Sequence, residues 1–283
     1  MRKLVISFSV YGDNDLYYSG AIANAVAIRQ FFPGWVARFY VDNIVAAKIR
    51  GQLENLGSEV IQMCRKKYPP MFWRFLAAGD QDIDTVIVRD VDALLCPRDW
   101  KTVRQWLNSS KKFHIIRDQP NHRSLIMCGL WGCKGGILKD IHSLINDYKR
   151  LNSVYEFGDD QRFLSIAIYP IISNSLYVST DFIAYGDEIV HPIKLPLPQN
   201  RWLGFPATRI EMQKIRIKLL KTQTTPDSSQ LQRFDFKDCP FTIPKKKKKR
   251  FRKLRSLINS NPLLKKLKLK ISHLIFRLSL IHI

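Results

Sequence analysis

The residues best suited to chemistry lie at 84–92, where a short apolar run ends in two closely spaced carboxylates. Residues 85–88 are mostly β-branched and apolar, which is the pattern of a strand buried on both faces. The run ends in Arg89 and the pair Asp90 and Asp92. Side chains two residues apart on an extended backbone point the same way, so the two carboxylates can converge on one point. Such a pair suits a hard divalent ion that completes its shell with water and substrate phosphates.

The same pattern has a plainer interpretation. It would also fit a solvated turn after a strand, with Asp92 capping the next helix. Two carboxylates at the end of a buried strand are costly unless a cation accompanies them. The pair alone does not decide between these two interpretations.

The elements around the pair alternate between strand and helix. We expect strands at 3–11, 35–41, 58–63 and 84–89, and helices at 17–32, 44–55 and 71–78. This alternation predicts an α/β fold: a mostly parallel, Rossmann-like sheet with helices on both faces. Ligands of such folds bind beyond the C-terminal ends of the strands. Asp90 and Asp92 lie at such an end, as do Ser9, Tyr11 and Gly12, which favours the metal interpretation.

The rest of the chain divides by composition. Further helices are expected at 99–108, 137–149 and 162–169, and a strand at 112–117. The glycines at 129–136 either let the backbone approach a ligand or turn a hairpin. We expect a catalytic domain at 1–221, a polar linker at 222–244 and a basic tail at 245–283.

Charge and cysteine content limit the class of protein. The net charge is +22, but residues 241–283 hold 14 Lys and Arg and no acidic residue, so the first 240 residues hold 32 basic against 24 acidic. The five cysteines form no CxxC pair, so neither a zinc site nor a disulfide framework is expected, and a cytoplasmic setting fits best. The first apolar run is too short for a signal peptide, and no apolar stretch has the length of a transmembrane helix.

Several stretches together resemble the GT-A-fold, nucleotide-sugar glycosyltransferases of bacteria and large DNA viruses that act in polysaccharide synthesis. No single stretch is specific, but their order and spacing over about residues 4–205 are. The stretches are 6–12 with Tyr18, Gly20 and Asn24; 32–35 with Tyr40 and Asp42; 72–75; 89–92; Trp106, Phe113, His114, Arg117, Asp118 and His122; 129–132; 158–161; and Pro198, Arg201 and Gly204.

The resemblance implies a donor site. Asp90 and Asp92 match the family's Asp-x-Asp, which holds Mn²⁺ or Mg²⁺ and the ribose, with UDP as the expected nucleotide. A third metal ligand is expected after residue 178, from Asp181 or His191. Ser9, Tyr11 and Gly12 would contact the nucleoside, and Arg74, Arg89 or Lys134 would add positive charge near the diphosphate. For Arg74 a solvent-facing helix position is the alternative, and for Ser9 and Tyr11 it is strand-end packing.

The resemblance also implies an acceptor, either a glycan or a lipid-linked glycan. Asp159 and Asp160 would recognise the sugar or, in an inverting enzyme, supply the general base. The alternative for both is a helix N-cap. Two other functions compete with a transferase: an Asp-nucleophile phosphatase of the HAD-like kind, and a non-enzymatic basic scaffold for membranes or RNA. The phosphatase usually carries its Asp-x-Asp on the first strand, whereas here three β-α units precede it.

The tail has the composition of a basic amphipathic segment. Residues 245–250 are six consecutive cations, followed by Leu and Ile at helical spacing with Lys and Arg between them. Such segments lie in the plane of an anionic membrane surface, so we expect peripheral membrane association. Packing on the body or a partner subunit is the alternative, and nucleic acid is disfavoured by the dense Leu and Ile content.

Removing the tail is expected to weaken binding to anionic liposomes. Each Lys or Arg near such a surface contributes ~1 kcal/mol, so a chain that ends at Asp238 should pellet far less than the full chain. Co-sedimentation measures the difference. Equal pelleting of the two chains would contradict the expectation.

Overall fold

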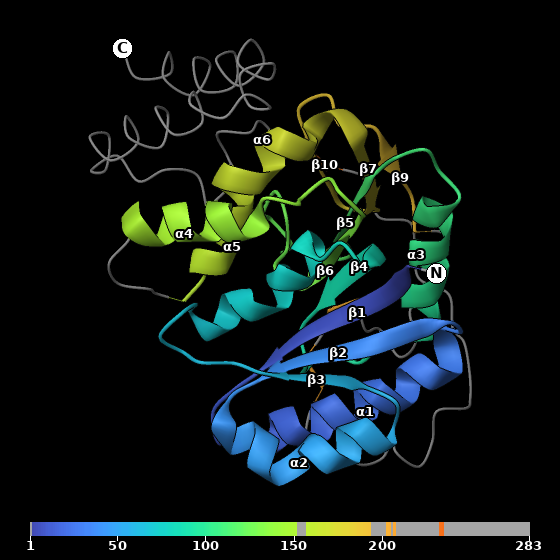
Figure 1. The fold of residues 1–283 in the computed structure, drawn as a ribbon. Coiled ribbons are helices and arrows are strands. Elements are labelled where there is room, and N and C mark those ends of the chain that lie inside the picture. Colours follow the sequence, from blue (N-terminus) through green and yellow to red (C-terminus); the bar gives the residue numbers. More distant parts are fainter. Residues whose placement is uncertain (1, 152–156, 194–201, 205, 208–231, 235–283) are drawn as a thin grey trace.

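The centre of the molecule is an eight-stranded sheet. The structure is a computed structural model that describes residues 2–151, 157–193, 202–204, 206–207 and 232–234 (Figure 1). The strand order is β3-β2-β1-β4-β6-β5-β7-β9, and β6 is antiparallel to both of its neighbours while all other pairs are parallel. The strands are β1 (Lys3–Val10), β2 (Trp35–Val41), β3 (Glu59–Gln62), β4 (Ile83–Arg89), β5 (Phe113–Arg117), β6 (Leu130–Lys134), β7 (Leu176–Thr180) and β9 (Val190–His191).

One face of the sheet is covered by α1 (Asp15–Phe31), α2 (Asn43–Asn55) and α3 (Pro97–Leu107). Its core contains Phe8 and Phe39, which are paired in register and stacked with ring centroids 4.9 Å apart. The first two helices start where the side chains of Asn14 and Asp42 accept hydrogen bonds from backbone N–H groups of the first turn. Predicted and observed bounds agree here to within two residues.

The other face is covered by the 3-10 helix η1 (Pro70–Gly79), by α4 (Ile141–Leu151) and α5 (Asp159–Phe163), and by the turns that follow, η2 (Leu164–Ile168), α6 (Tyr169–Ile172) and η3 (Ser173–Ser175). Trp73, Phe75 and Trp131 are fully buried between these elements and the sheet. Figure 1 shows α1 and α2 below the sheet and α4, α5 and α6 above it. The predicted fold class, a mostly parallel α/β sheet covered on both faces, is therefore confirmed.

Two segments differ from the prediction. The glycine-rich stretch at 129–136 contains strand β6, which inserts between β4 and β5; a Cβ on Gly132 would lie 2.7 Å from Ile87 Cγ2 and 2.9 Å from the carbonyl oxygen of Val86. Glycine is thus needed at residue 132 for close packing between strands rather than for a ligand. Within the predicted linker, β10 (Gln232–Phe234) pairs in parallel with β8 (Ile183–Tyr185). The predicted tail, 245–283, lies outside the described residues.

Buried ion pairs join the loops to this framework. Arg117 and Glu188 form a bidentate pair of 2.7 and 2.9 Å, and the side chains are 0% and 4% exposed. Glu188 also accepts hydrogen bonds from the hydroxyl of Tyr169 and the backbone N–H of Tyr185. Buried charges persist only when paired and hydrogen-bonded in this way.

Glu188→Gln is expected to lower the free energy of unfolding by about 3–5 kcal/mol, because it leaves the Arg117 guanidinium charged and unpaired in the interior. Urea denaturation measures the loss. The matched control is Glu54→Gln, since Glu54 pairs with Arg50 in an exposed i,i+4 pair of 2.8 Å; it should cost about 0.5 kcal/mol or less. Similar losses in both variants would contradict this assignment.

Candidate functional site

The two carboxylates singled out in the sequence lie at the C-terminal end of β4, the strand between β1 and β6. Asp90 is the residue after the strand, and its side chain is 34% exposed. Asp92 is partly buried two residues later. Burial, and then repulsion by Asp90, raise the pKa of the Asp92 carboxyl above its usual range. The acidic pair therefore lacks part of the positive charge that would balance it.

Arg74 is the main cation of this site. It lies in η1, and its side chain is only 7% exposed. One guanidinium nitrogen, Nη2, is 3.2 Å from Asp90 Oδ1 and 2.9 Å from Asp160 Oδ2, so Arg74 joins the acidic pair to α5. Its Nε has no hydrogen-bond partner within the described residues. Arg74 is thus a buried site residue, and the solvent-facing alternative is wrong.

Two serines of β1 hold Arg74 in place. The Ser7 hydroxyl donates to the Arg74 carbonyl oxygen at 2.7 Å, and the Arg74 N–H donates to Ser9 Oγ at 2.8 Å. Both serines point to the same face of the strand and are 0% and 5% exposed. Ser9, predicted to contact a nucleoside, instead positions the backbone of Arg74.

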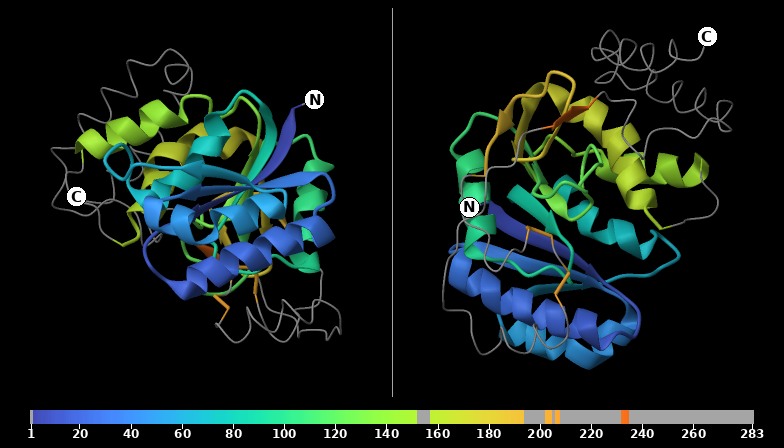
Figure 2. Two further views of the ribbon diagram at one scale, coloured as in Figure 1. Left: turned by 60° about the horizontal axis from the view of Figure 1, so that its bottom comes forward. Right: turned by 180° about the vertical axis from the view of Figure 1, so that it is seen from behind.

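The loop that carries Asp92 is held by a neutral side chain. The Asn24 amide nitrogen donates to the carbonyl oxygens of Val91 and Ala93, both at 3.1 Å, and its oxygen accepts from Leu95 N–H at 3.0 Å. A second contact comes from far along the chain, where Ala207 N–H donates to the Asp92 carbonyl oxygen at 2.8 Å. Figure 2 shows this short orange segment beside the central strands.

Two tyrosines and a cysteine complete the surroundings. Burial raises the pKa of Tyr11, while the charge of Arg74 lowers it and that of Asp160 raises it. Burial, then the charges of Asp92 and Asp90, raise the pKa of Tyr17 in the first turn of α1. Cys128 Sγ lies 3.9 Å from Asp90 Oδ2, and burial raises its thiol pKa well above the usual range. These groups are neutral, so they add shape and hydrogen bonds but no charge.

Gly12 lies next to this site, with its backbone amide already engaged. Its N–H donates to Asp42 Oδ2 at 2.9 Å, and its φ of +81° favours glycine. Burial alone would raise the pKa of Asp42, but hydrogen bonds from Arg65, Gly12 and Val45 lower it. The C-terminal ends of β1 and β2 are thereby joined.

The structure places two predicted cations elsewhere. Arg89 points away from the acidic pair, because its guanidinium forms a buried bidentate pair with Asp99 at 2.8 and 3.0 Å. Lys134 pairs in register with Thr85, near the start of β4, and its ammonium donates to the carbonyl oxygens of Leu107 and Ser109. Lys134 therefore lies at the opposite edge of the sheet. Neither Arg89 nor Lys134 lies where it was predicted, near the donor diphosphate.

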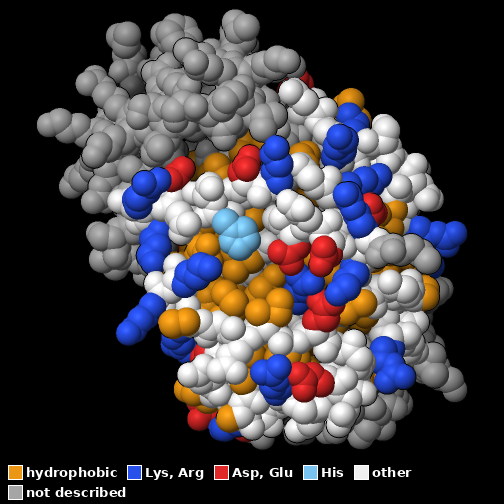
Figure 3. Space-filling model, viewed as in Figure 1, with side chains coloured by type: hydrophobic (Ala, Val, Ile, Leu, Met, Phe, Trp, Pro, Cys, Tyr) orange, Lys and Arg blue, Asp and Glu red, His pale blue; other side chains and the backbone are white. Residues whose placement is uncertain are grey.

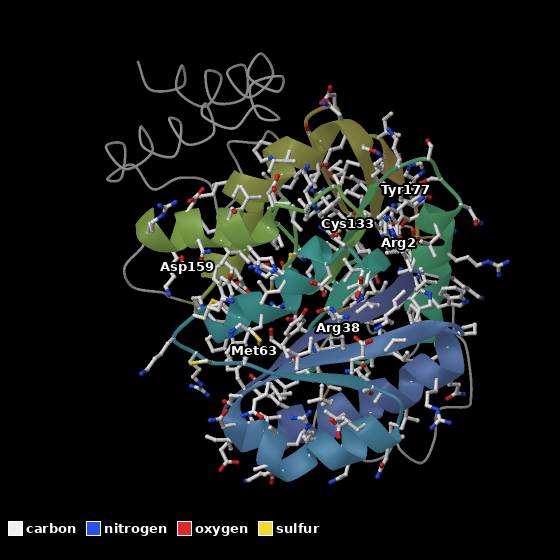
Figure 4. All side chains as sticks on the ribbon, in the orientation of Figure 1. Arg2, Arg38, Met63, Cys133, Asp159 and Tyr177 are labelled. Carbon is white, nitrogen blue, oxygen red and sulfur yellow. The ribbon has the colours of Figure 1, made fainter. Side chains whose placement is uncertain are left out.

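The side chains of Asp159 and Asp160 point to different partners. Asp159 is paired with Arg162 and lies 3.3 Å from the Tyr148 hydroxyl (Figure 4). Of these two aspartates, only Asp160 contacts Arg74. Burial raises the pKa of the Asp160 carboxyl, although Arg74 opposes the shift. Of the predicted catalytic pair, only Asp160 belongs to the site.

The two residues predicted as the third metal ligand are also engaged elsewhere. Asp181 Oδ1 accepts from Ile193 N–H at 2.9 Å, and its Oδ2 lies 3.7 Å from Arg98. His191 stacks on Tyr177 with ring centroids 3.8 Å apart. In the described part of the chain no three His, Cys, Asp or Glu side chains gather as a metal site. A third protein ligand from Asp181 or His191 is therefore not supported.

Asp90 and Asp92 nevertheless fit a divalent ion. Both offer hard oxygen donors, and burial, followed by repulsion from Asp90, raises the pKa of Asp92, so a bound cation would favour its charged form. Mg²⁺ in particular is commonly held by one or two carboxylates with water and phosphate oxygens.

Three residues at the site, Ser7, Tyr17 and Cys128, were not predicted from the sequence. The alternation of β1 contained a signal for Ser7, since Ser7 and Ser9 share a face and lead to the site. Tyr17 could have been found from its place in the first turn of the helix after β1. Nothing local marks Cys128, because its position depends on the unpredicted strand β6.

Gly129→Ala is expected to displace Asp90, because a Cβ at residue 129 would lie 2.0 Å from Asp90 Oδ2 and 2.9 Å from Asp90 N. We expect the free energy of unfolding to fall by about 1–3 kcal/mol and Mn²⁺ binding, measured by equilibrium dialysis, to be lost. Gly51→Ala is the control: nothing lies within 4 Å of its Cβ, and it should stabilise α2 by roughly 0.5–1 kcal/mol. Unchanged stability and Mn²⁺ binding in Gly129→Ala would contradict the geometry.

Comparisons with known proteins gave matches of fold only. No family model and no curated protein matches the chain. Similar solved structures include 4-diphosphocytidyl-2C-methyl-D-erythritol synthase from Anaerococcus prevotii, at 11% identity and a TM-score of 0.42, covering 63% of this chain and 87% of that one.

Two others are named as sugar-transferring enzymes. Glucosyl-3-phosphoglycerate synthase from Mycobacterium tuberculosis, solved with Mn²⁺, UDP-glucose and phosphoglyceric acid, has 13% identity and a TM-score of 0.39, covering 63% of this chain and 69% of that one. The glycosyltransferase GlyE from Streptococcus pneumoniae has 14% identity and a TM-score of 0.43, covering 63% and 45%. At TM-scores below 0.5 these similarities do not establish a function, so the function is inferred from the geometry of the site.

Proposed function

We propose that this protein is a metal-dependent glycosyltransferase that moves a sugar from a nucleoside-diphosphate donor to a glycan or lipid-linked acceptor in polysaccharide synthesis. The observation that carries the proposal is the pair of carboxylates Asp90 and Asp92 at the C-terminal end of β4 in a mostly parallel sheet, with Asp90 joined through buried Arg74 to Asp160. Ligands of such sheets bind at this edge.

Asp90 and Asp92 would hold Mn²⁺ or Mg²⁺ together with the donor diphosphate. When bound, the ion acts as a Lewis acid that stabilises charge on the leaving diphosphate. Arg74 directs its guanidinium into the same site, and its Nε, which has no partner among the described residues, leaves one N–H for a ligand. A buried guanidinium suits phosphate or sugar oxygens because its donors are fixed in a plane.

Asp160 is the residue we assign to the sugar or the acceptor. Its carboxyl is held by Arg74 and by the N–H of Gln161 at 2.9 Å. Burial raises its pKa, so its carboxylate is a stronger base than an exposed one. It would accept a hydrogen bond from a sugar hydroxyl, or take the proton of the attacking hydroxyl in an inverting reaction.

The nucleoside would lie beside β1, where Tyr11 and Gly12 follow the strand. Tyr11 offers a partly exposed ring next to Arg74 and Asp160. Uridine is the nucleoside we take for the donor, following the family resemblance. We further propose that the basic tail holds the enzyme peripherally on a cytoplasmic membrane face. In the described segments, no helix combines the length and apolar character needed to span a bilayer.

Donor binding gives a direct test. UDP with Mn²⁺ at about 100 times its Kd should stabilise the native protein by about 2.7 kcal/mol, a rise in Tm of several degrees. Asp92→Asn should abolish this rise while leaving the Tm of the free protein unchanged or higher, because it removes repulsion between Asp90 and Asp92. Asp84→Asn is the control: the residue is exposed and lies near the start of the same strand.

Other outcomes of the same assay decide between the competing functions. A rise in Tm with beryllofluoride and Mg²⁺, but none with UDP and Mn²⁺, would indicate an Asp-nucleophile phosphatase. No response to either ligand would contradict both enzymes and leave a binding scaffold.

A further inference from the structure

A cluster of cations lies beside the candidate site, at the same edge of the sheet. It comes from the loop after β3, the last turn of α4 and α5, and we call it the basic rim: Arg65, Lys66, Lys67, Lys149, Arg150 and Arg162. Arg65 pairs with Asp42, and Asp42 accepts the N–H of Gly12 at the end of β1. The rim therefore adjoins the site on its β2 side.

Contacts join these three segments into one surface. Lys149 Nζ donates to the carbonyl oxygens of Lys66 and Lys67 at 3.0 and 3.1 Å. The Tyr148 hydroxyl lies 3.3 Å from Asp159, which ties α4 to α5. In Figure 3, Lys and Arg side chains gather on the left of the view, over α4 and the loop after β3. Figure 4 places Asp159 and Met63 on that same side.

The acidic residues near the rim leave its lysines uncompensated. Asp42, Asp147 and Asp159 each pair with one arginine of the rim. Two of these acids, Asp42 and Asp159, are 3% and 2% exposed, so they lie beneath the surface. Within the described residues no ion pair joins a carboxylate to Lys66, Lys67 or Lys149. The outer layer of the rim is therefore almost entirely positive.

A large apolar side chain precedes α5, the helix that carries Arg162 of the rim. Phe157 is fully exposed, and it directly precedes Gly158, the residue that opens α5. An exposed aromatic ring among Lys and Arg is typical of surfaces that lie at the bilayer interface, where charges meet headgroups and the ring enters the acyl boundary. The same chain carries a tail dense in Leu, Ile and Lys, a composition that favours lipid over nucleic acid.

We infer that the basic rim is a docking face for an anionic lipid bilayer. It is a second contact, distinct from the tail, and it is made by the folded body itself. Because the rim and the candidate site share one edge of the sheet, docking would bring that edge to the lipid surface, where a lipid-linked acceptor is presented. The inference does not depend on the transfer reaction, since vesicle binding and donor binding are measured separately.

The test uses the full chain with Lys66→Gln and Lys67→Gln combined, and vesicles of phosphatidylcholine with or without phosphatidylglycerol. Each cation near an anionic surface contributes about fivefold to partitioning, so the double variant should bind anionic vesicles roughly 25-fold more weakly. The matched control is Lys101→Gln with Arg104→Gln, two exposed cations of α3 on the other face of the sheet. It should bind within about twofold of the natural chain, because charges beyond the ~10 Å screening length contribute little.

Three results would overturn the inference. Equal losses in the two double variants would mean that only net charge matters. Undiminished vesicle binding by the Lys66 and Lys67 variant would mean that the tail alone docks. A loss of binding to a single-stranded oligonucleotide, with vesicle binding intact, would assign the rim to nucleic acid. An unchanged Tm of the free protein in both double variants shows that neither result comes from a damaged fold.

Discussion

The candidate site depends on one buried guanidinium placed between two carboxylates. Arg74 Nη2 reaches both Asp90, which directly follows strand β4, and Asp160 of helix α5, 70 residues apart in sequence. Without it, buried Asp160 would lie close to the acidic pair with no cation to balance it, and the pKa of its carboxyl would rise further. With it, Asp160 has a charged partner, and Asp90 and Asp92 keep a deficit of positive charge that a metal ion can fill.

Most buried arginines near the sheet are already paired with carboxylates. Arg89, Arg98 and Arg117 are each closed into buried bidentate pairs with Asp99, Asp118 and Glu188. These pairs fix loops against the sheet and leave no donor for a ligand's phosphate. The site itself is held by neutral groups, the hydroxyls of Ser7 and Ser9 and the amide of Asn24. The charged groups of the site are thereby left for ligand binding, because hydrogen bonds from uncharged side chains hold the site in position.

What could be predicted from sequence follows from locality. Continuous apolar runs predict β1, β2 and β4 because each strand is buried on both faces, and the end of β4 then locates Asp90 and Asp92. The antiparallel strand β6 was missed because its Gly-rich sequence has the composition of a loop; only packing against Ile87 shows why glycine is required. Asp159 and Asp160 cannot be distinguished in sequence. Because successive residues of a helix point in different directions, the first pairs with Arg162 and the second with Arg74. Lys134 was assigned to the wrong edge because the direction of its strand was unknown.

The central claim is that Asp90 and Asp92 together hold a divalent ion against a donor diphosphate. Crystals soaked with Mn²⁺ and UDP, with anomalous scattering recorded at the manganese edge, test it most directly. We expect one strong anomalous peak within coordination distance of both carboxylates, with the diphosphate on its open side. A peak at other residues, or bound UDP whose diphosphate lies away from Asp90 and Asp92, would contradict it.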